Sequence, residues 1–250
     1  MGHERLGMLP KTRRWQAIVS DVASGDVNAA HVSRIAAATL NALGKRYVDL
    51  AGDESVRSAF TFLVELARDA KGPASEYGLA NRNPLALVSD LSARTRATNG
   101  SLEVREIANR AAADAIAAWY VENGAQADLF GDLPPKNRWK GLETGAGFCE
   151  LSRRYFSKLT ERYLAYFLER EISAALPNLS VRDDFQKRLN QHIGDVSRHS
   201  FETAKITQSF AAGWFNKNVL YGSPTDAEVR RFLSHAFSKL REDLRREDKR

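Results

Sequence analysis

Positively charged side chains gather around one tryptophan near the middle of the chain. Residues 134 to 162 contain seven lysines and arginines against three acidic residues. Cations hold phosphates, and an exposed tryptophan ring can stack on an unpaired base. Three of the cations recur at four-residue intervals, which places them on one face of a helix. We therefore predict nucleic-acid contacts at Lys136, Arg138, Trp139, Lys140, Arg154, Lys158 and Arg162.

A second group of the same kind stands near the N-terminus, where Arg13 and Arg14 precede Trp15. We predict that both arginines contribute to nucleic-acid binding. The alternative is that Trp15 and Trp139 anchor the hydrophobic core beside cations that are merely solvated. The two interpretations differ in whether the rings are exposed, and the sequence leaves both open.

A short motif precedes the basic run and consists of Gln126, Ala127, Asp128, Leu129 and Phe130. It resembles the pentapeptide of bacterial sliding-clamp ligands, in which Gln and a Ser or Asp precede Leu and Phe. In such a peptide an extended segment places two apolar side chains in a preformed groove, and the glutamine amide fixes the register. The resemblance covers five residues and implies partner-binding roles for Gln126, Asp128, Leu129 and Phe130. The alternative is that Leu129 and Phe130 fold back onto the core.

Histidines and carboxylates alternate later in the chain, at His192, Asp195, His199 and Glu202. Their spacing places them along one side of a helix, where they would suit metal binding or proton transfer. The two histidines would lie about 10 Å apart along the axis, so one ion would need further ligands from another helix. We name His192 and His199 as metal candidates, with two histidines at a helix–helix interface as the alternative.

No sequence pattern indicates a nucleotide cofactor or a catalytic nucleophile. The glycine-rich stretch 141–147 lacks both the lysine and the preceding strand of a phosphate-binding loop. The single cysteine, Cys149, has no histidine near it in sequence, which favours a buried structural thiol. We expect no cofactor and no catalytic residue.

Composition and charge indicate a globular protein with a mildly basic surface. The chain has 250 residues, 43% of them hydrophobic, and a net charge of +6. Residues 1–125 carry 15 basic and 14 acidic side chains, whereas residues 126–250 carry 22 and 17. Such a balance permits a nucleic-acid partner without requiring one. We see no apolar run long enough for a membrane span and no apolar leader, so we expect a cytoplasmic protein.

Apolar residues recur at intervals of three and four throughout, which predicts an all-α fold. Asp53, the pair Asn83 and Pro84, and Ser101 are expected to begin helices, and Gly44 is expected to end one. We expect an irregular bundle of about eight helices. They lie near 12–23 and 27–43, after Asp53 as far as Gly72, from Pro84 onward, from Ser101 to Tyr120, near 146–175, from Ser180 to about Val219, and around the apolar residues from Val229 to Leu244. The helix at 146–175 has aromatic residues on more than one face, which predicts a central, buried position.

Five of the 16 glycines fall in a break at 123–147, together with Pro134 and Pro135. Since glycine and proline interrupt helices, we predict an N-terminal lobe at 1–122, a connecting loop at 123–147 and a long-helix lobe at 148–250. A single compact domain is the alternative, because the later helices are long enough to contact the first lobe throughout.

Three functions are compatible with these features. The first is a non-enzymatic adaptor subunit of a larger assembly that acts on or near nucleic acid, with a basic face and a protein-binding loop or terminal helix. The second is a module that binds only proteins. The third is an enzyme or metal site on the helix face of His192 and His199. We predict the first, with a protein partner and no membrane contact.

Overall fold

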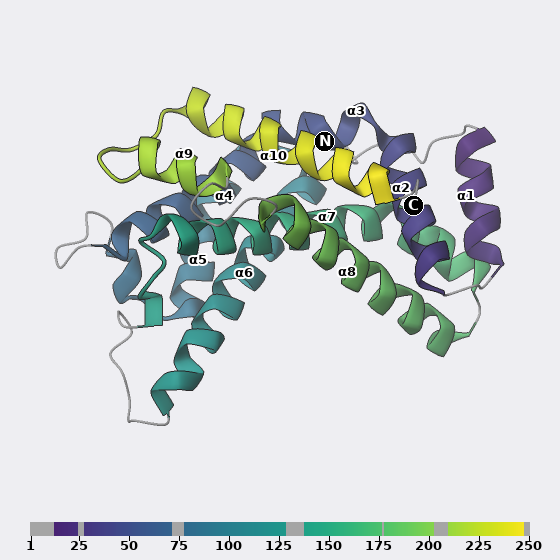
Figure 1. Cartoon of the computed structure of the whole chain (residues 1–250), viewed down its shortest axis with the longest axis horizontal. Coiled ribbons are helices and arrows are strands. Elements are labelled where there is room, and N and C mark those ends of the chain that lie inside the picture. The colour runs from purple at the N-terminus through teal and green to yellow at the C-terminus, as the bar shows by residue number, and fades with distance from the viewer. Residues whose placement is uncertain are drawn as a thin grey trace.

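Every regular element in the described part of the chain is a helix (Figure 1). The computed structural model describes residues 13–24, 28–71, 78–128, 138–176, 178–202 and 210–247. Within these ranges there are ten α-helices and two short 3-10 helices. They are α1 (Arg13–Ala23), α2 (Ala29–Leu43), α3 (Lys45–Asp49), η1 (Leu50–Gly52), α4 (Glu54–Asp69), η2 (Leu79–Asn81), α5 (Pro84–Arg96), α6 (Leu102–Asp128), α7 (Gly145–Ala175), α8 (Leu179–Glu202), α9 (Phe210–Asn218) and α10 (Asp226–Glu247). The predicted all-α class is confirmed.

Local capping explains where several helices begin. The Asp53 carboxylate accepts hydrogen bonds from the backbone N–H groups of Ser55 and Val56 at the start of α4. Asn83 accepts one from Ala86, with Pro84 as the first residue of α5. A side-chain acceptor satisfies an N–H group that has no carbonyl partner in the first turn. The predicted starts of these two helices are therefore confirmed.

Helix α7 is the central element of the molecule. It packs against α1, α4, α6, α8 and α9, and its aromatic side chains are buried on more than one face. Phe156 meets Phe60 of α4 at a ring-centroid distance of 5.6 Å and Phe237 of α10 at 5.2 Å. A helix that is apolar around most of its circumference is stable only when other helices cover it. The predicted central position is confirmed.

The buried residues of both predicted lobes belong to one hydrophobic core. Trp15, Leu63 and Ile116 from the first lobe join the same cluster as Phe156 and Leu240 from the second. Helix α10 packs against α2 and α4, and α6 packs against α7, so contacts cross the predicted boundary repeatedly. The division into two lobes is not confirmed.

Three element boundaries differ from the prediction. Helix α6 continues to Asp128, five residues beyond the predicted start of the break, because Gly124 is accommodated inside the helix. Residues 180–219 contain two helices, α8 and α9, with residues 203–209 outside the described ranges. Residues 45–49 form the short helix α3, which the prediction omitted. No helix within the described residues has the length and apolar character needed to cross a membrane.

Candidate functional site

A polar groove opens where α6 and α8 meet α7. Figure 1 shows α6 and α8 diverging from the region of α7, so that the C-terminal end of α6 projects from the body of the molecule. The groove has a volume of about 240 Å³. It is lined by side chains of α6 and α7 and by Gly194 of α8. Three of the cations predicted from the sequence, Arg154, Lys158 and Arg162, lie in it or beside it.

Ion pairs connect α6 and α7 along the groove. Arg154 donates to both carboxylate oxygens of Glu122, at 2.8 and 2.5 Å. About two helical turns further along α7, Arg162 donates to Asp114 at 2.6 Å. The acids are eight residues apart on α6, and the arginines are eight residues apart on α7. Two antiparallel helices with equal spacings can form both pairs at once, so the pairs fix the register between them.

Further ion pairs within α7 occupy the remaining cations of the groove. Glu150 accepts hydrogen bonds from Arg153 and Arg154, at distances between 2.5 and 2.8 Å. Lys158 donates to Glu161 at 2.9 Å. These partners are three or four residues apart, which is the spacing at which helical side chains meet. Each cation on this face therefore has an acidic neighbour.

The two glutamates of α7 respond oppositely to their surroundings. Burial disfavours the charge of Glu150, but the hydrogen bonds and positive charges of Arg153 and Arg154 outweigh it and hold the pKa below its usual value. Burial raises the pKa of Glu161, and its contacts with Lys158 and Ser157 offset that effect only in part. Glu150 is thus the firmly ionised partner of the arginines, and Glu161 is the more readily protonated one.

The predicted basic face on α7 needs correction. Arg153, Arg154, Lys158 and Arg162 are balanced by four carboxylates, those of Asp114, Glu122, Glu150 and Glu161. A phosphate would have to displace these carboxylates before it could bind the cations. The helical spacing of the cations was predicted correctly, but the surface that they form carries both charges.

Trp139 is a core anchor in this structure and offers no ring face to a base. Its side chain is 0% exposed, and its ring centroid lies 5.6 Å from that of Tyr120 on α6. A tight turn produces this position, because the Leu142 N–H donates to the Trp139 carbonyl and Gly141 adopts a φ of +90°. Within the same segment Arg138 lies over the Tyr120 ring at 4.7 Å, and Lys140 is exposed. The predicted stacking role of Trp139 is therefore wrong.

The N-terminal basic group is far from the central one. Trp15 is buried, and its indole N–H donates to Glu171 near the end of α7. Trp139 lies just before the start of α7, a helix of 31 residues that spans about 45 Å. The two groups therefore lie at opposite ends of α7 and do not form one patch. Arg13 is exposed, and the Arg14 side chain lies outside the described residues.

The sliding-clamp-like motif begins inside a helix. Gln126 and Asp128 belong to the last turn of α6, but their side chains are not among those that the structure describes. Leu129, Phe130 and Lys136 lie outside the described residues altogether. The prediction placed all five motif residues in an irregular segment. Since the resemblance requires an extended peptide, the last turn of α6 would have to unwind before this motif could bind a groove.

The histidine candidates are only partly described. His192 is half-buried on α8, and the His199 side chain lies outside the described residues. No group of three or more His, Cys, Asp or Glu side chains that could hold a metal ion occurs among the residues that the structure describes. Cys149 is buried in the first turns of α7, in the position expected of a structural thiol.

The acidic partners of the groove were not identified from the sequence. Two signals were available: the Glu150 to Arg154 and Lys158 to Glu161 spacings within α7, and the shared eight-residue spacing of Asp114 and Glu122 with Arg154 and Arg162. The first predicts pairing within a helix. The second becomes meaningful only when α6 and α7 are known to be antiparallel neighbours.

Comparison with known proteins identified no similar protein. No family model, curated protein or solved structure matches the chain.

Proposed function

We propose that this protein is a non-enzymatic helical adaptor subunit of a larger assembly, which contacts a protein partner through the end of α6 and the adjoining groove. The observation that carries the proposal is the exposed surface at the projecting end of α6. Val121 is 66% exposed there, whereas Trp119, two residues earlier, is 7% exposed. An apolar side chain on an exposed helix face can pack into an apolar groove of a partner.

The groove beside α6 supports a protein partner in preference to a nucleic acid. Its cations and carboxylates are present in equal numbers, so it offers both charges to an incoming surface. The Glu122 carboxylate is 61% exposed and can exchange Arg154 for a cation of the partner. Replacing one ion pair by another contributes to specificity for the partner more than to binding affinity.

The position of the contact can be tested by photo-crosslinking in the cells from which the protein comes. A crosslinking amino acid would replace Val121 in one variant and Leu85 in a control variant. Leu85 is 81% exposed at the start of α5 and lies outside the groove. We expect one specific crosslinked protein from position 121 and none of that protein from position 85. Equal crosslinking from both positions would contradict the proposal.

Once a partner is captured, its affinity can be measured for three variants. Val121→Asp and Glu122→Arg should each weaken binding, because they change the surface at the end of α6. The pair Leu129→Ala and Phe130→Ala tests the sliding-clamp-like motif separately. Loss of binding only in this last variant would mean that the partner binds the motif and not the helix surface.

Weak nucleic-acid contact is a second candidate function, supported by cations just before α7. Lys140 is exposed, and Arg138 is half-buried beside it. Fluorescence anisotropy with labelled DNA and RNA, measured over a salt series, tests this candidate. The triple change of Lys136, Arg138 and Lys140 to Glu should weaken binding and flatten its salt dependence, since each lost phosphate contact removes about one unit of slope. Control changes of Arg110 and Arg231 to Glu, at two exposed positions, should have less effect for each cation changed.

A further inference from the structure

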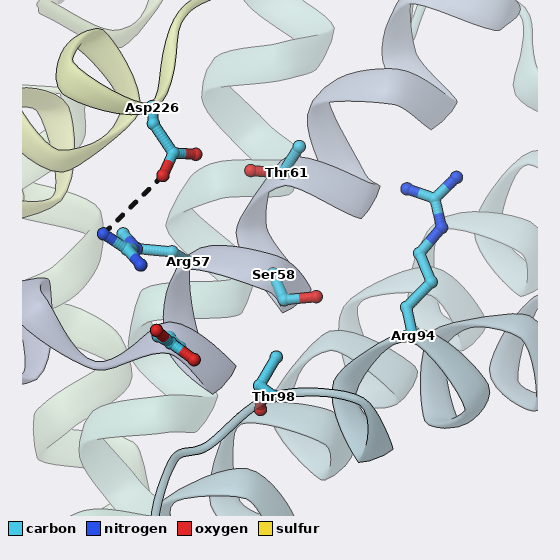
Figure 2. Close-up of a pocket in the computed structure, with 7 residues that line it drawn as sticks. Arg57, Ser58, Thr61, Arg94, Thr98 and Asp226 are labelled. Carbon is cyan, nitrogen blue, oxygen red and sulfur yellow. Dashed lines mark ion pairs between the residues drawn. The ribbon is translucent and has the colours of Figure 1, made fainter.

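A second polar cavity is lined by α4, the end of α5 and the start of α10, and it shares no residue with the α6–α7 groove. Its volume is about 320 Å³, within the range of small-ligand sites. Four of its lining residues come from one face of α4, where Glu54, Arg57, Ser58 and Thr61 follow the spacing of adjacent helical turns. The remaining walls are Arg94 of α5, Thr98 after α5, and Asp226 at the start of α10. In Figure 2 the labelled residues come from three segments of the chain, with Arg57 and Asp226 paired on one side and Arg94 on the other.

Arg57 is the chemically unusual member of this cavity. Its side chain is 13% exposed, yet its buried Nε and Nη1 atoms have no hydrogen-bond partner among the described residues. Its charge is opposed by Asp226, whose carboxylate is 3.7 Å from Nη1, beyond hydrogen-bond distance, and is 82% exposed (Figure 2). A mostly buried guanidinium with two nitrogens that make no hydrogen bond is unfavourable. An acceptor in the cavity that bonded to the part of Arg57 lining it would offset some of this cost.

Two hydroxyl groups beside Arg57 are also available. Ser58 and Thr61 line the cavity, and neither side chain makes a hydrogen bond within the described part of the chain. Thr98 differs, because its hydroxyl bonds with Ser55 at 2.8 Å and donates to the Thr95 carbonyl. The cavity therefore offers a cation and two adjacent hydroxyls to a ligand.

The second arginine of the cavity is already engaged. Arg94 forms an ion pair with Glu65 and lies over the Phe62 ring at 5.3 Å. In Figure 2 its side chain lies apart from the pair formed by Arg57 and Asp226. Since Glu65 neutralises Arg94, the remaining charges of the cavity are the ion pair of Arg57 with Asp226 and the carboxylate of Glu54, which also accepts a hydrogen bond from the Asn99 N–H. A ligand with negative charge alone would meet repulsion from both carboxylates.

We infer that this cavity binds a small zwitterion that carries both a carboxylate and a protonated amine, as an amino acid does. The guanidinium of Arg57 would donate a charge-assisted hydrogen bond to the carboxylate. The carboxylates of Glu54 and Asp226 accept from the amine, and the hydroxyls of Ser58 and Thr61 complete the polar contacts. This inference is independent of the adaptor function, because the cavity shares no lining residue with the groove beside α6.

Calorimetric titration with the common L-amino acids, and with acetate, ethylamine and inorganic phosphate as single-charge probes, tests the inference. We expect at least one amino acid to bind saturably and to raise the unfolding temperature, with each single-charge probe at least tenfold weaker. No binding by any amino acid would overturn the inference. Acetate or phosphate binding as tightly as the best amino acid would also overturn it, because the carboxylates of the cavity would then have no role.

Substitutions locate the binding in the cavity. Arg57→Met should weaken the best amino acid at least tenfold, whereas Arg68→Met, on the same helix but outside the cavity, should not. Asp226→Asn is a second variant, at a side chain that is 82% exposed. It should weaken the amino acid but leave acetate binding unchanged or stronger, since it removes a negative charge. Wild-type affinity in both Arg57→Met and Asp226→Asn would contradict the assignment.

Discussion

Arg154 of α7 and Glu122 of α6 are joined by two hydrogen bonds, at 2.8 and 2.5 Å, although they are 32 residues apart in sequence. Arg154 also donates to Glu150 on its own helix, at 2.7 Å. One arginine thus links a carboxylate that is 61% exposed with one that is 29% exposed. The two interactions should differ in strength, because solvent screens the more exposed one more effectively.

Double-mutant cycles with Arg154→Met should separate these interactions. We expect a coupling of about 1–2 kcal/mol with Glu150→Gln, in keeping with a partly buried, charge-assisted hydrogen bond. The coupling with Glu122→Gln should be below about 1 kcal/mol and should fall further at high salt. Urea denaturation at two salt concentrations measures both values. A larger coupling with Glu122 would mean that the contact between α6 and α7 is the dominant one.

The opposite pKa shifts of Glu161 and Glu150 predict opposite pH dependences. Burial raises the pKa of Glu161 above its usual value of 4.5, so the folded protein holds this proton more tightly than the unfolded chain does. Its contribution to stability is therefore fully present below the unfolded pKa and is lost as the pH rises through the folded pKa. The stability of Glu161→Gln relative to wild type should increase over the same interval.

Glu150→Gln is the matched control for this pH dependence. Because the pKa of Glu150 is lowered in the folded protein, its contribution is present above the unfolded pKa and is lost as the pH falls through the folded pKa. Wild type should therefore exceed Glu150→Gln in stability most at neutral pH. Denaturation curves from about pH 3 to pH 7 cover both transitions. Parallel curves for the two variants would contradict the assigned shifts.

Two buried tyrosines should respond differently to loss of the hydroxyl group. The Tyr47 hydroxyl bonds with that of Thr160 at 2.6 Å, whereas the buried Tyr163 hydroxyl has no partner among the described residues. Tyr47→Phe should lower the free energy of unfolding by about 1 kcal/mol. Tyr163→Phe should be neutral or stabilising, since it removes a polar group that makes no hydrogen bond. Urea denaturation of both variants provides the comparison.

Two glycines should respond oppositely to alanine. A Cβ atom on Gly147 would lie 2.0 Å from the Gly141 carbonyl oxygen, and that backbone cannot move without disturbing the turn that seats Trp139. Gly147→Ala should therefore cost about 2 kcal/mol or more and should alter tryptophan fluorescence. Gly213, inside α9, has no atom within 4 Å of such a Cβ. Gly213→Ala should stabilise by about 0.5–1 kcal/mol, because alanine favours a helix.

Most helices could be predicted from the sequence because their signals are local. Asp53 and Asn83 cap the turns that follow them, and Gly44 ends α2 with a positive φ of 39°. Apolar residues at intervals of three and four marked the buried faces. The exceptions were also local in origin. Gly124 did not end α6, because a single glycine lowers helix stability by only about 1 kcal/mol and the helix continued through it.

The candidate site could be predicted only in part. The cations at 154, 158 and 162 were placed on one helix face by their spacing alone. The partners on α6, Asp114 and Glu122, depend on segments that are distant in sequence, and so do the burial of Trp139 and the cavity around Arg57. The polar stripe of α4 was visible as Glu54, Arg57, Ser58 and Thr61 at helical spacing, but nothing in that pattern placed Asp226 opposite it.

The sequence by itself determined the helical class, most helix boundaries and the central position of α7, because hydrogen bonding and apolar periodicity within a helix act over a few residues. Tertiary structure decided which charges face each other and which rings are exposed. The sequence offers Arg154 only Glu150 as a partner, four residues earlier, and Arg154 bonds to Glu122 only because α6 lies antiparallel to α7. Charge pairing and burial depend on packing between distant segments, which no local pattern specifies.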